Sequence, residues 1–268
     1  MAAERILLLT IFLICPFLSG GVASFNPATG EEEIVLVPVE KERNMGRNID
    51  KKVKKHYSLP ADPLMQERVE KIGERLSVVT DRRDMIYRFT VLNDDEEENY
   101  NAFAAPGGYV YIFEDLVELL ETDDNIAAVL AHEMGHVEAR HSMKRLQGNI
   151  GVTALMLAGG QMHKEEGTYA AASKAIGQLI SAYSRQDEKQ ADELSVKYLE
   201  RAGFDPNGAI GALVKLKELR KKGKIMKYSA YKSHPYLSSR LAYLNKSTKG
   251  YTDFDSYINQ APGTDGTQ

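Results

Sequence analysis

Cysteine is nearly absent from this chain of 268 residues: Cys15 is the only one, and it lies in an apolar N-terminal segment. If that segment is removed, the remaining chain has no thiol and no disulfide partner. Any metal ion must then be bound by nitrogen and oxygen atoms, which excludes a cysteine-based structural zinc site.

An excess of positive charge is also absent. The chain carries 34 Lys and Arg against 38 Asp and Glu, so its formal net charge is -4. It therefore lacks the basic footprint of a nucleic-acid-binding protein, and we expect no nucleic-acid partner. The apolar content of 43% and charged content of 27% are ordinary for a globular protein.

Apolar runs long enough to cross a membrane, about 20 residues, are lacking as well. The run from Ile6 to Leu18 follows Arg5 and leads into small residues up to Ser24, which predicts a secretory signal peptide over residues 1–24. An uncleaved membrane anchor is the alternative. A signal peptide would direct the protein to export, into a periplasm or outside the cell. Ile14 before Cys15 is not the small residue of a lipoprotein site, so lipidation is disfavoured.

The second apolar stretch, Ile150 to Ala158, is also too short to span a bilayer. We interpret it as a core helix or a flap near the active site. Peripheral membrane association through this stretch is the alternative.

The segment from Ala131 to His136 reads Ala-His-Glu-Met-Gly-His inside a predicted helix. Positions four apart share one helix face, so His132 and His136 can bind one metal ion together. Glu133 lies about 100° further round the helix and can reach a water on that ion. Two imidazoles with an adjacent carboxylate are the core of a zinc hydrolase site. Thr122 is the expected N-cap of this helix, and Gly148 is its expected end.

A catalytic zinc site usually has a third protein ligand. His141 is the nearest histidine, but it follows His132 by nine residues and would face the opposite side of a continuous helix. The sequence also lacks the glycine bend of enzymes that use such a histidine, because Ala139 and Ser142 occupy the two diagnostic positions. We therefore interpret His141 as a surface histidine.

Glu188 and Asp192 are better candidates, because they lie four apart on a second predicted helix. Glu188 is the predicted third ligand, and Asp192 is predicted to accept the free ring N–H of a ligand histidine. The alternative is a solvated charged helix face, since Lys189 and Glu193 are also there.

The remaining chain predicts an α+β fold that is predominantly helical, with a small sheet beside the active-site helix. Residues 25–58 are polar and irregular and are expected to form an extended arm, residues 59–248 one catalytic domain, and residues 249–268 a flexible tail. The elements expected in the domain are helices near residues 62–79, 114–120, 169–203, 207–222 and 235–244, and strands at residues 87–92 and 109–113.

Together these motifs resemble the M48 family of zinc metallopeptidases, in particular its secreted bacterial members of the HExxH…ExxxD gluzincin type. The resemblance covers roughly residues 50 to 245. The motifs that carry it are Ala131–His136, Ser184-Arg185, Glu188-x-Gln-Ala-Asp192, Ser233-His234-Pro235 with Arg240, Asn101–Ala104 and Pro106-Gly107-Gly108. One departure is Gln190, where many members carry Glu.

The resemblance implies a zincin-like domain with one Zn²⁺ per chain, bound by His132, His136 and Glu188, and with Glu133 as general base. It also places His234 and Arg240 near the site, where either could stabilise the oxyanion of the transition state. His234 could instead cap the metal in a resting state, or be only a helix N-terminal histidine.

The expected function is zinc-dependent endoproteolysis of exported or misfolded envelope proteins, with protein or peptide substrates. A zinc-binding periplasmic chaperone or scaffold with little proteolytic activity is the alternative. We further expect the strand that contains Gly108, Tyr109, Val110 and Tyr111 to be an edge strand that pairs with an extended substrate.

Overall fold

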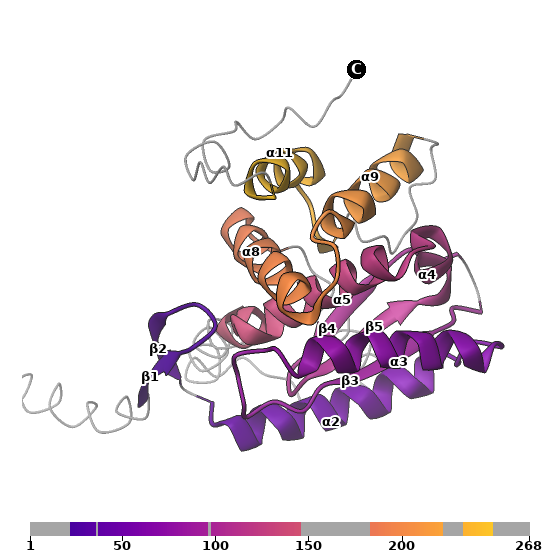
Figure 1. Ribbon diagram of the computed structural model, residues 1–268. Coiled ribbons are helices and arrows are strands. Elements are labelled where there is room, and N and C mark those ends of the chain that lie inside the picture. Colours follow the sequence, from indigo (N-terminus) through magenta and orange to yellow (C-terminus); the bar gives the residue numbers. More distant parts are fainter. Residues whose placement is uncertain (1–21, 36, 96–97, 146–182, 222–232, 249–268) are drawn as a thin grey trace, which may run out of the picture.

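A small three-stranded sheet lies at the centre of the computed structural model (Figure 1). Its order is β3 (Arg88–Leu92), β5 (Tyr109–Phe113), β4 (Ala102–Ala105), with β3 parallel and β4 antiparallel to β5. This confirms the predicted α+β class, and it adds β4, which the sequence pattern did not predict. The structure describes residues 22–35, 37–95, 98–145, 183–221 and 233–248.

Helices cover both faces of this sheet, because successive strand residues point to opposite sides. Tyr109, Tyr111 and Phe113 face the side covered by α2 (Val39–His56), where they pack with Val53. Val110 and Ile112 belong to the other core, which includes α3 (Pro63–Ser77) and α5 (Asp123–Glu138). The nearly continuous apolar run of β5 thus reflects burial on both faces.

The expected extended arm over residues 25–58 is wrong. These residues contribute to the hairpin of β1 (Val22–Asn26) and β2 (Glu31–Val35) and then form α2. Helix α2 packs closely on the turn before β5, where a Cβ on Gly46 would collide with the carbonyl of Pro106. The glycine that suggested irregular chain instead permits this close contact.

Helix α5 begins where its sequence predicts, because the Thr122 side chain accepts a hydrogen bond from the backbone N–H of Asn125 at 3.3 Å. It ends much earlier than predicted. Glu138 is its last residue, Arg140 has a positive φ of 57°, and residues 141–145 start a new helical stretch. The expected end at Gly148 lies outside the described residues.

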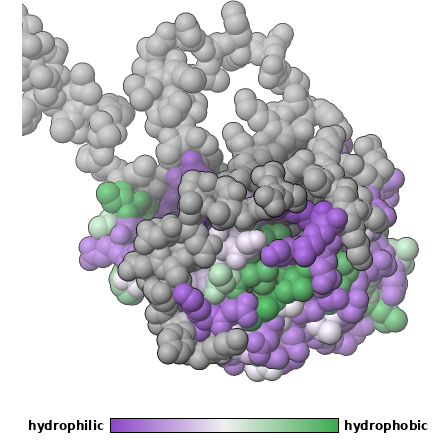
Figure 2. Space-filling model, turned by 90° about the horizontal axis from the view of Figure 1, so that it is seen from above, coloured by the Kyte–Doolittle hydropathy of each residue, from purple (hydrophilic) through white to green (hydrophobic). Residues whose placement is uncertain are grey.

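Three helices lie on the side of α5 away from the sheet: α8 (Arg185–Ala202), α9 (Gly208–Lys221) and α11 (Leu237–Ser247) (Figure 1). They confirm the described parts of the predicted helices in this region, and α3 and the short α4 (Glu114–Leu120) confirm two more. Seen from that side, hydrophobic residues gather in the middle of the described surface, with hydrophilic residues around them (Figure 2).

Several predictions from sequence concern residues that the structure does not describe: most of the signal peptide, the Ile150–Ala158 stretch, residues 169–182 and the tail. Among the residues that are described, no helix is both long and apolar enough to span a membrane.

The expectation that Gly108–Tyr111 line an edge strand is wrong. Strand β5 is the middle strand, and its backbone is paired with β3 on one side and β4 on the other. It has no free edge to offer an extended peptide. Within the described sheet the edges are β3 and β4, and β4 is the one that packs against α5.

Helices α5 and α8 cross in direct backbone contact at Gly135. A Cβ at this position would lie 2.9 Å from the carbonyl oxygen of Ala191 and 3.1 Å from its Cα. The Ser195 hydroxyl adds a hydrogen bond of 3.1 Å to the carbonyl of Ala128, one helical turn before His132. The crossing therefore requires small residues, and it brings His132 and His136 close to Glu188.

We predict that Gly135→Val forces the two helices apart, since neither backbone can yield to the added side chain. The expected cost is about 1–3 kcal/mol of unfolding free energy, together with weaker metal binding. Thermal or urea unfolding and metal titration measure the two effects. Glu74→Val, which puts the same side chain on an exposed helical position of α3, is the control. A Gly135→Val protein with the stability and metal affinity of the control would contradict this account.

Candidate metal centre

Helix α5 presents His132 and His136 toward one point, as their spacing of four predicts. Their Nε2 atoms lie 3.2 Å apart, and the two rings meet edge to face at a centroid distance of 4.8 Å. Both histidines are buried. Glu133 is also buried, and its Oε2 atom has no hydrogen-bond partner among the described residues.

Helix α8 brings Glu188 to the same point. Ser184 begins this helix with a capping box, in which its side chain and that of Asp187 each accept the other residue's backbone N–H. Glu188 follows in the first turn and is completely buried. Its Oε2 lies 3.4 Å from Nε2 of His132, and its Oε1 lies 3.6 Å from Nε2 of His136.

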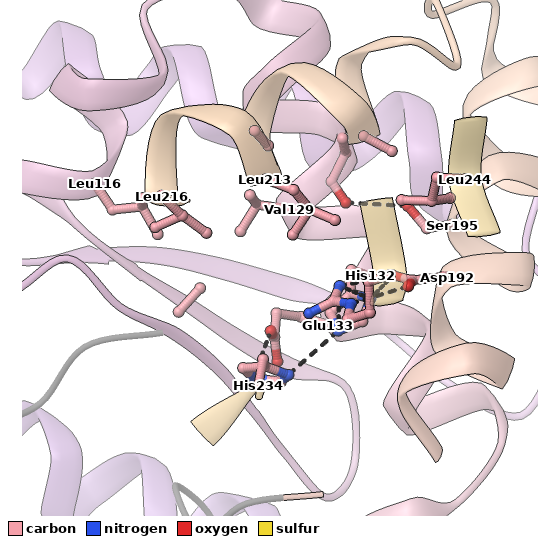
Figure 3. Close-up of a pocket in the computed structure, with 15 residues that line it drawn as sticks. Leu116, Val129, His132, Glu133, Asp192, Ser195, Leu213, Leu216, His234 and Leu244 are labelled. Carbon is pink, nitrogen blue, oxygen red and sulfur yellow. Dashed lines mark hydrogen bonds and ion pairs between the residues drawn. The ribbon is translucent and has the colours of Figure 1, made fainter. Parts of the chain in front are cut away.

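His234 completes a cluster of four. Its Nδ1 lies 3.2 Å from Nε2 of His132 and 3.0 Å from Oε1 of Glu188. Its other nitrogen, Nε2, lies 3.2 Å from Oε1 of Glu133 (Figure 3). His234 reaches the site from the segment before α11, which the Ser233 hydroxyl ties to the start of β4 through a 3.1 Å hydrogen bond to Asn101.

The donor set fits a tetrahedral metal ion. Ligand atoms about 2.0–2.1 Å from zinc stand about 3.3–3.4 Å from one another. The measured separations within the cluster of His132, His136, Glu188 and His234 range from 3.0 to 3.6 Å, and one potential ligand atom from each residue lies within 4.8 Å of the others. Four buried nitrogen and oxygen donors at this spacing constitute a metal site.

Asp192 lies where the spacing from Glu188 predicts, with Oδ1 3.0 Å from Nδ1 of His132. The ring can therefore donate its Nδ1–H to the carboxylate and keep Nε2 free for a metal. Arg240 in turn binds Asp192 through Nε at 2.9 Å and Nη2 at 2.6 Å. The predicted support of a ligand histidine is thus itself held by a buried arginine.

Arg240 contacts both acidic residues of the site. Besides Asp192, its Nη1 lies 2.8 Å from Oε2 of Glu188, and the residue is buried. Its guanidinium thus bridges two carboxylates of the site, and its Nη2 also lies 3.2 Å from Nδ1 of His132. These contacts allow Arg240 to hold Asp192 and Glu188 in place, and the expectation that it stabilises the oxyanion stays a prediction.

The charged residues in this cluster shift one another's pKa values. Burial alone would raise the pKa of Glu188, but His234, Arg240 and His132 hold it well below its usual range. Burial would likewise raise the pKa of Asp192, but Arg240 and His132 outweigh this effect and lower it. Burial and Arg240 lower the pKa of His132, while its contacts with Asp192 and Glu188 prevail and raise it to about 9. Both carboxylates are thus ionised and ready to balance a cation.

Two residues of the site were missed or misplaced by the sequence. His141 is buried rather than on the surface, and its Nδ1 lies 2.8 Å from Nδ1 of His136. Tyr183 stacks on the His136 ring at a centroid distance of 3.7 Å and an interplanar angle of 21°. His141 was misplaced because the end of α5 at Glu138 was not predicted. No motif indicated Tyr183.

An apolar pocket adjoins the cluster on the side of α9 and α11. His132 and Glu133 lie at one end of it (Figure 3). Ala102 of β4 also lines it. Most of the other lining residues are aliphatic, among them Val129, Leu213, Leu216 and Leu244 (Figure 3). Asp192, Ser195, His234 and Arg240 also line it.

Comparison with known proteins agrees with this geometry. The model of peptidase family M48 matches residues 63–248, which contain all four donors and Glu133. The chain belongs to this family. Among its relatives, the mitochondrial metalloendopeptidase OMA1 of Schizosaccharomyces pombe is 28% identical over 71% of this chain and 58% of its own length.

Two relatives from Escherichia coli K12 are each 26% identical. The beta-barrel assembly-enhancing protease aligns over 90% of this chain and 50% of its own length, and metalloprotease LoiP over 69% and 71%. The chain spans about half the length of the first two relatives. Membership of this M48 family supports a zinc-binding site of metalloprotease type at the cluster.

We predict that Asp192→Asn weakens zinc binding about 10- to 100-fold, because the amide cannot supply the negative charge that holds the proton of His132 on Nδ1. Competition with a chromophoric chelator measures the affinity. Glu200→Gln, the same chemical change at an exposed position of α8, is the control and should bind as wild type. Unaltered zinc affinity in Asp192→Asn would contradict the assigned contact with His132.

Proposed function

We propose that this M48 protein is a zinc-dependent metalloendopeptidase that binds one Zn²⁺ per chain through His132, His136 and Glu188. The observation that best supports this proposal is that the buried donor set lies beside Glu133. The Oε2 atom of Glu133 lacks a hydrogen-bond partner among the described residues. A structural metal site needs no such carboxylate. A hydrolase needs one to accept the proton of the attacking water.

The residues divide the work as follows. Zinc, when bound, polarises the scissile carbonyl and makes water more acidic. Glu133 accepts a proton from the attacking water and passes it to the leaving amine. Asp192 and Arg240 hold His132 and Glu188 in place during this step, and the buried surroundings strengthen each electrostatic contact.

His234 is proposed to act as a gate. Its Nδ1 stands at the fourth corner of the donor cluster, the position that a catalytic site leaves open. At the same time its Nε2 contacts the carboxylate of Glu133. The His234 side chain thus fills the position of the attacking water and also contacts the general base, so it must move before hydrolysis. This arrangement favours a resting cap over an oxyanion donor.

Substrate is proposed to bind beside β4 rather than β5. Strand β4 is an edge of the described sheet, it packs on α5, and Ala102 borders the apolar pocket next to Glu133. An extended peptide along this edge would place one side chain in that pocket. We therefore expect preference for an aliphatic residue next to the scissile bond.

Exported or misfolded envelope proteins are the proposed substrates, and a bacterial periplasm or the cell exterior is the proposed location. The N-terminal sequence supports export, because a charged residue, an apolar run and small residues follow in order. A relative named beta-barrel assembly-enhancing protease aligns over most of this chain. A non-proteolytic chaperone or scaffold is the alternative, and the retained Glu133 speaks against it.

Glu133→Gln should abolish peptide hydrolysis, at least about 100-fold, while zinc content stays at one per chain, since the residue is a base and not a ligand. Glu188→Ala should instead lower zinc content. Casein digestion with and without a chelator, together with metal analysis, separates the two results. Glu200→Gln is the control. Normal zinc stoichiometry in Glu188→Ala would overturn the third-ligand assignment, and a fully active Glu133→Gln would overturn the proposed enzyme.

His234→Ala should raise peptidase activity several-fold, because it opens the fourth position and releases Glu133. Turnover of a fluorogenic peptide at saturating zinc is the measurement. A lower turnover with unchanged zinc content would show that His234 assists the reaction and does not gate it.

A further inference from the structure

We infer that His141 is a positioning residue for the metal site: it fixes the proton of His136 on Nδ1 and so keeps Nε2 available for the metal. The inference rests on the proposed metal site, but it concerns a residue outside the donor cluster. Its basis is a chain of hydrogen bonds that runs from His136 through His141 to α8.

The end of helix α5 at Glu138 and the turn that follows it make this contact possible. On a continuous helix His141 would point about 180° away from His132. The positive φ of Arg140 reverses the chain instead, and His141 returns to His136. The N-terminal hairpin secures this reversal, because the Asn26 amide donates to the carbonyl of Glu138 at 2.9 Å and Glu33 pairs with Lys144 at 2.8 Å.

The neighbours of His141 determine which of its nitrogens carries the proton. Its Nε2 lies 2.9 Å from Oε1 of Gln190 and 3.5 Å from Oδ1 of Asp187. Both of these atoms are acceptors, so Nε2 must be the donor. A neutral imidazole has one donor and one acceptor, so Nδ1 of His141 carries a lone pair.

The same logic determines the state of His136. Its Nδ1 lies 2.8 Å from that lone pair, so Nδ1 of His136 must be the donor. Its Nε2, which faces His132 and Glu188, is then unprotonated and able to bind a metal. Tyr183 stacks on the ring and restricts its rotation. The opposite tautomer would place a proton on the nitrogen that faces the donor cluster.

The two ligand histidines are thus supported differently. His132 has a carboxylate partner, Asp192, whereas His136 has a neutral histidine backed by an amide. Gln190 is the residue that ends the chain of hydrogen bonds. Its contact with His141 links it indirectly to the ligand His136.

The test compares two replacements of His141. In His141→Asn a side-chain oxygen can occupy the place of Nδ1 and still accept from His136, whereas His141→Leu has no acceptor. Zinc affinity, measured by chelator competition, should fall about 10- to 100-fold in His141→Leu and stay within about threefold of wild type in His141→Asn. His56→Leu, at an exposed histidine, is the control. Equal affinities of the Leu and Asn variants would overturn the inference.

A second measurement needs no variant and guards against loss of folding. Long-range ¹⁵N–¹H correlation spectra of the zinc-loaded wild-type protein identify the proton-bearing nitrogen of each histidine. We expect His136 with its proton on Nδ1 and His141 with its proton on Nε2. A proton on Nδ1 of His141 would overturn the inference. If wild-type protein binds no zinc, the proposed metal site fails instead, so the two failures are distinguishable.

Discussion

The contact between α5 and α8 at Gly135 is the constraint on which the site depends. The backbones meet there without a side chain between them, and His132, His136 and Glu188 lie on either side of that crossing. The sheet supports α5 from one side, and α8, α9 and α11 enclose it from the other (Figure 1). If the two helices were about one ångström further apart, the donor atoms would lie beyond the spacing that a tetrahedral ion requires.

Burial of so many charges is tolerated only because each has a partner. Asp192 and Glu188 share Arg240, and His132 contacts both carboxylates. Removing one member would leave a buried charge uncompensated, which usually costs more than the pair contributes. The polar network therefore holds the side chains of the site in place. A bound cation would add positive charge beside the two carboxylates and would accept the lone pairs of the imidazoles.

The sequence predicted the parts of this site that depend on local rules. Helical spacing placed His132 with His136 and Glu188 with Asp192, and the capping residue Thr122 identified the start of α5. The features that were predicted wrongly depend on contacts between segments that are distant in the sequence. The reversal at Arg140 is secured by Asn26 and Glu33, more than a hundred residues earlier, and the order of the sheet is fixed by pairing of β3 and β4 with β5. Neither leaves a periodic signal in the nearby sequence, so the burial of His141 and the central position of β5 were not predicted.

The most direct test of the account is X-ray absorption at the zinc edge on the wild-type, zinc-loaded protein. The account predicts one bound zinc with only nitrogen and oxygen neighbours at about 2.0–2.2 Å, and the scattering pattern of three imidazoles when His234 caps the site. A coordination shell with one imidazole or none, or dominated by water, would contradict the claim that α5 and α8 assemble a metal centre here.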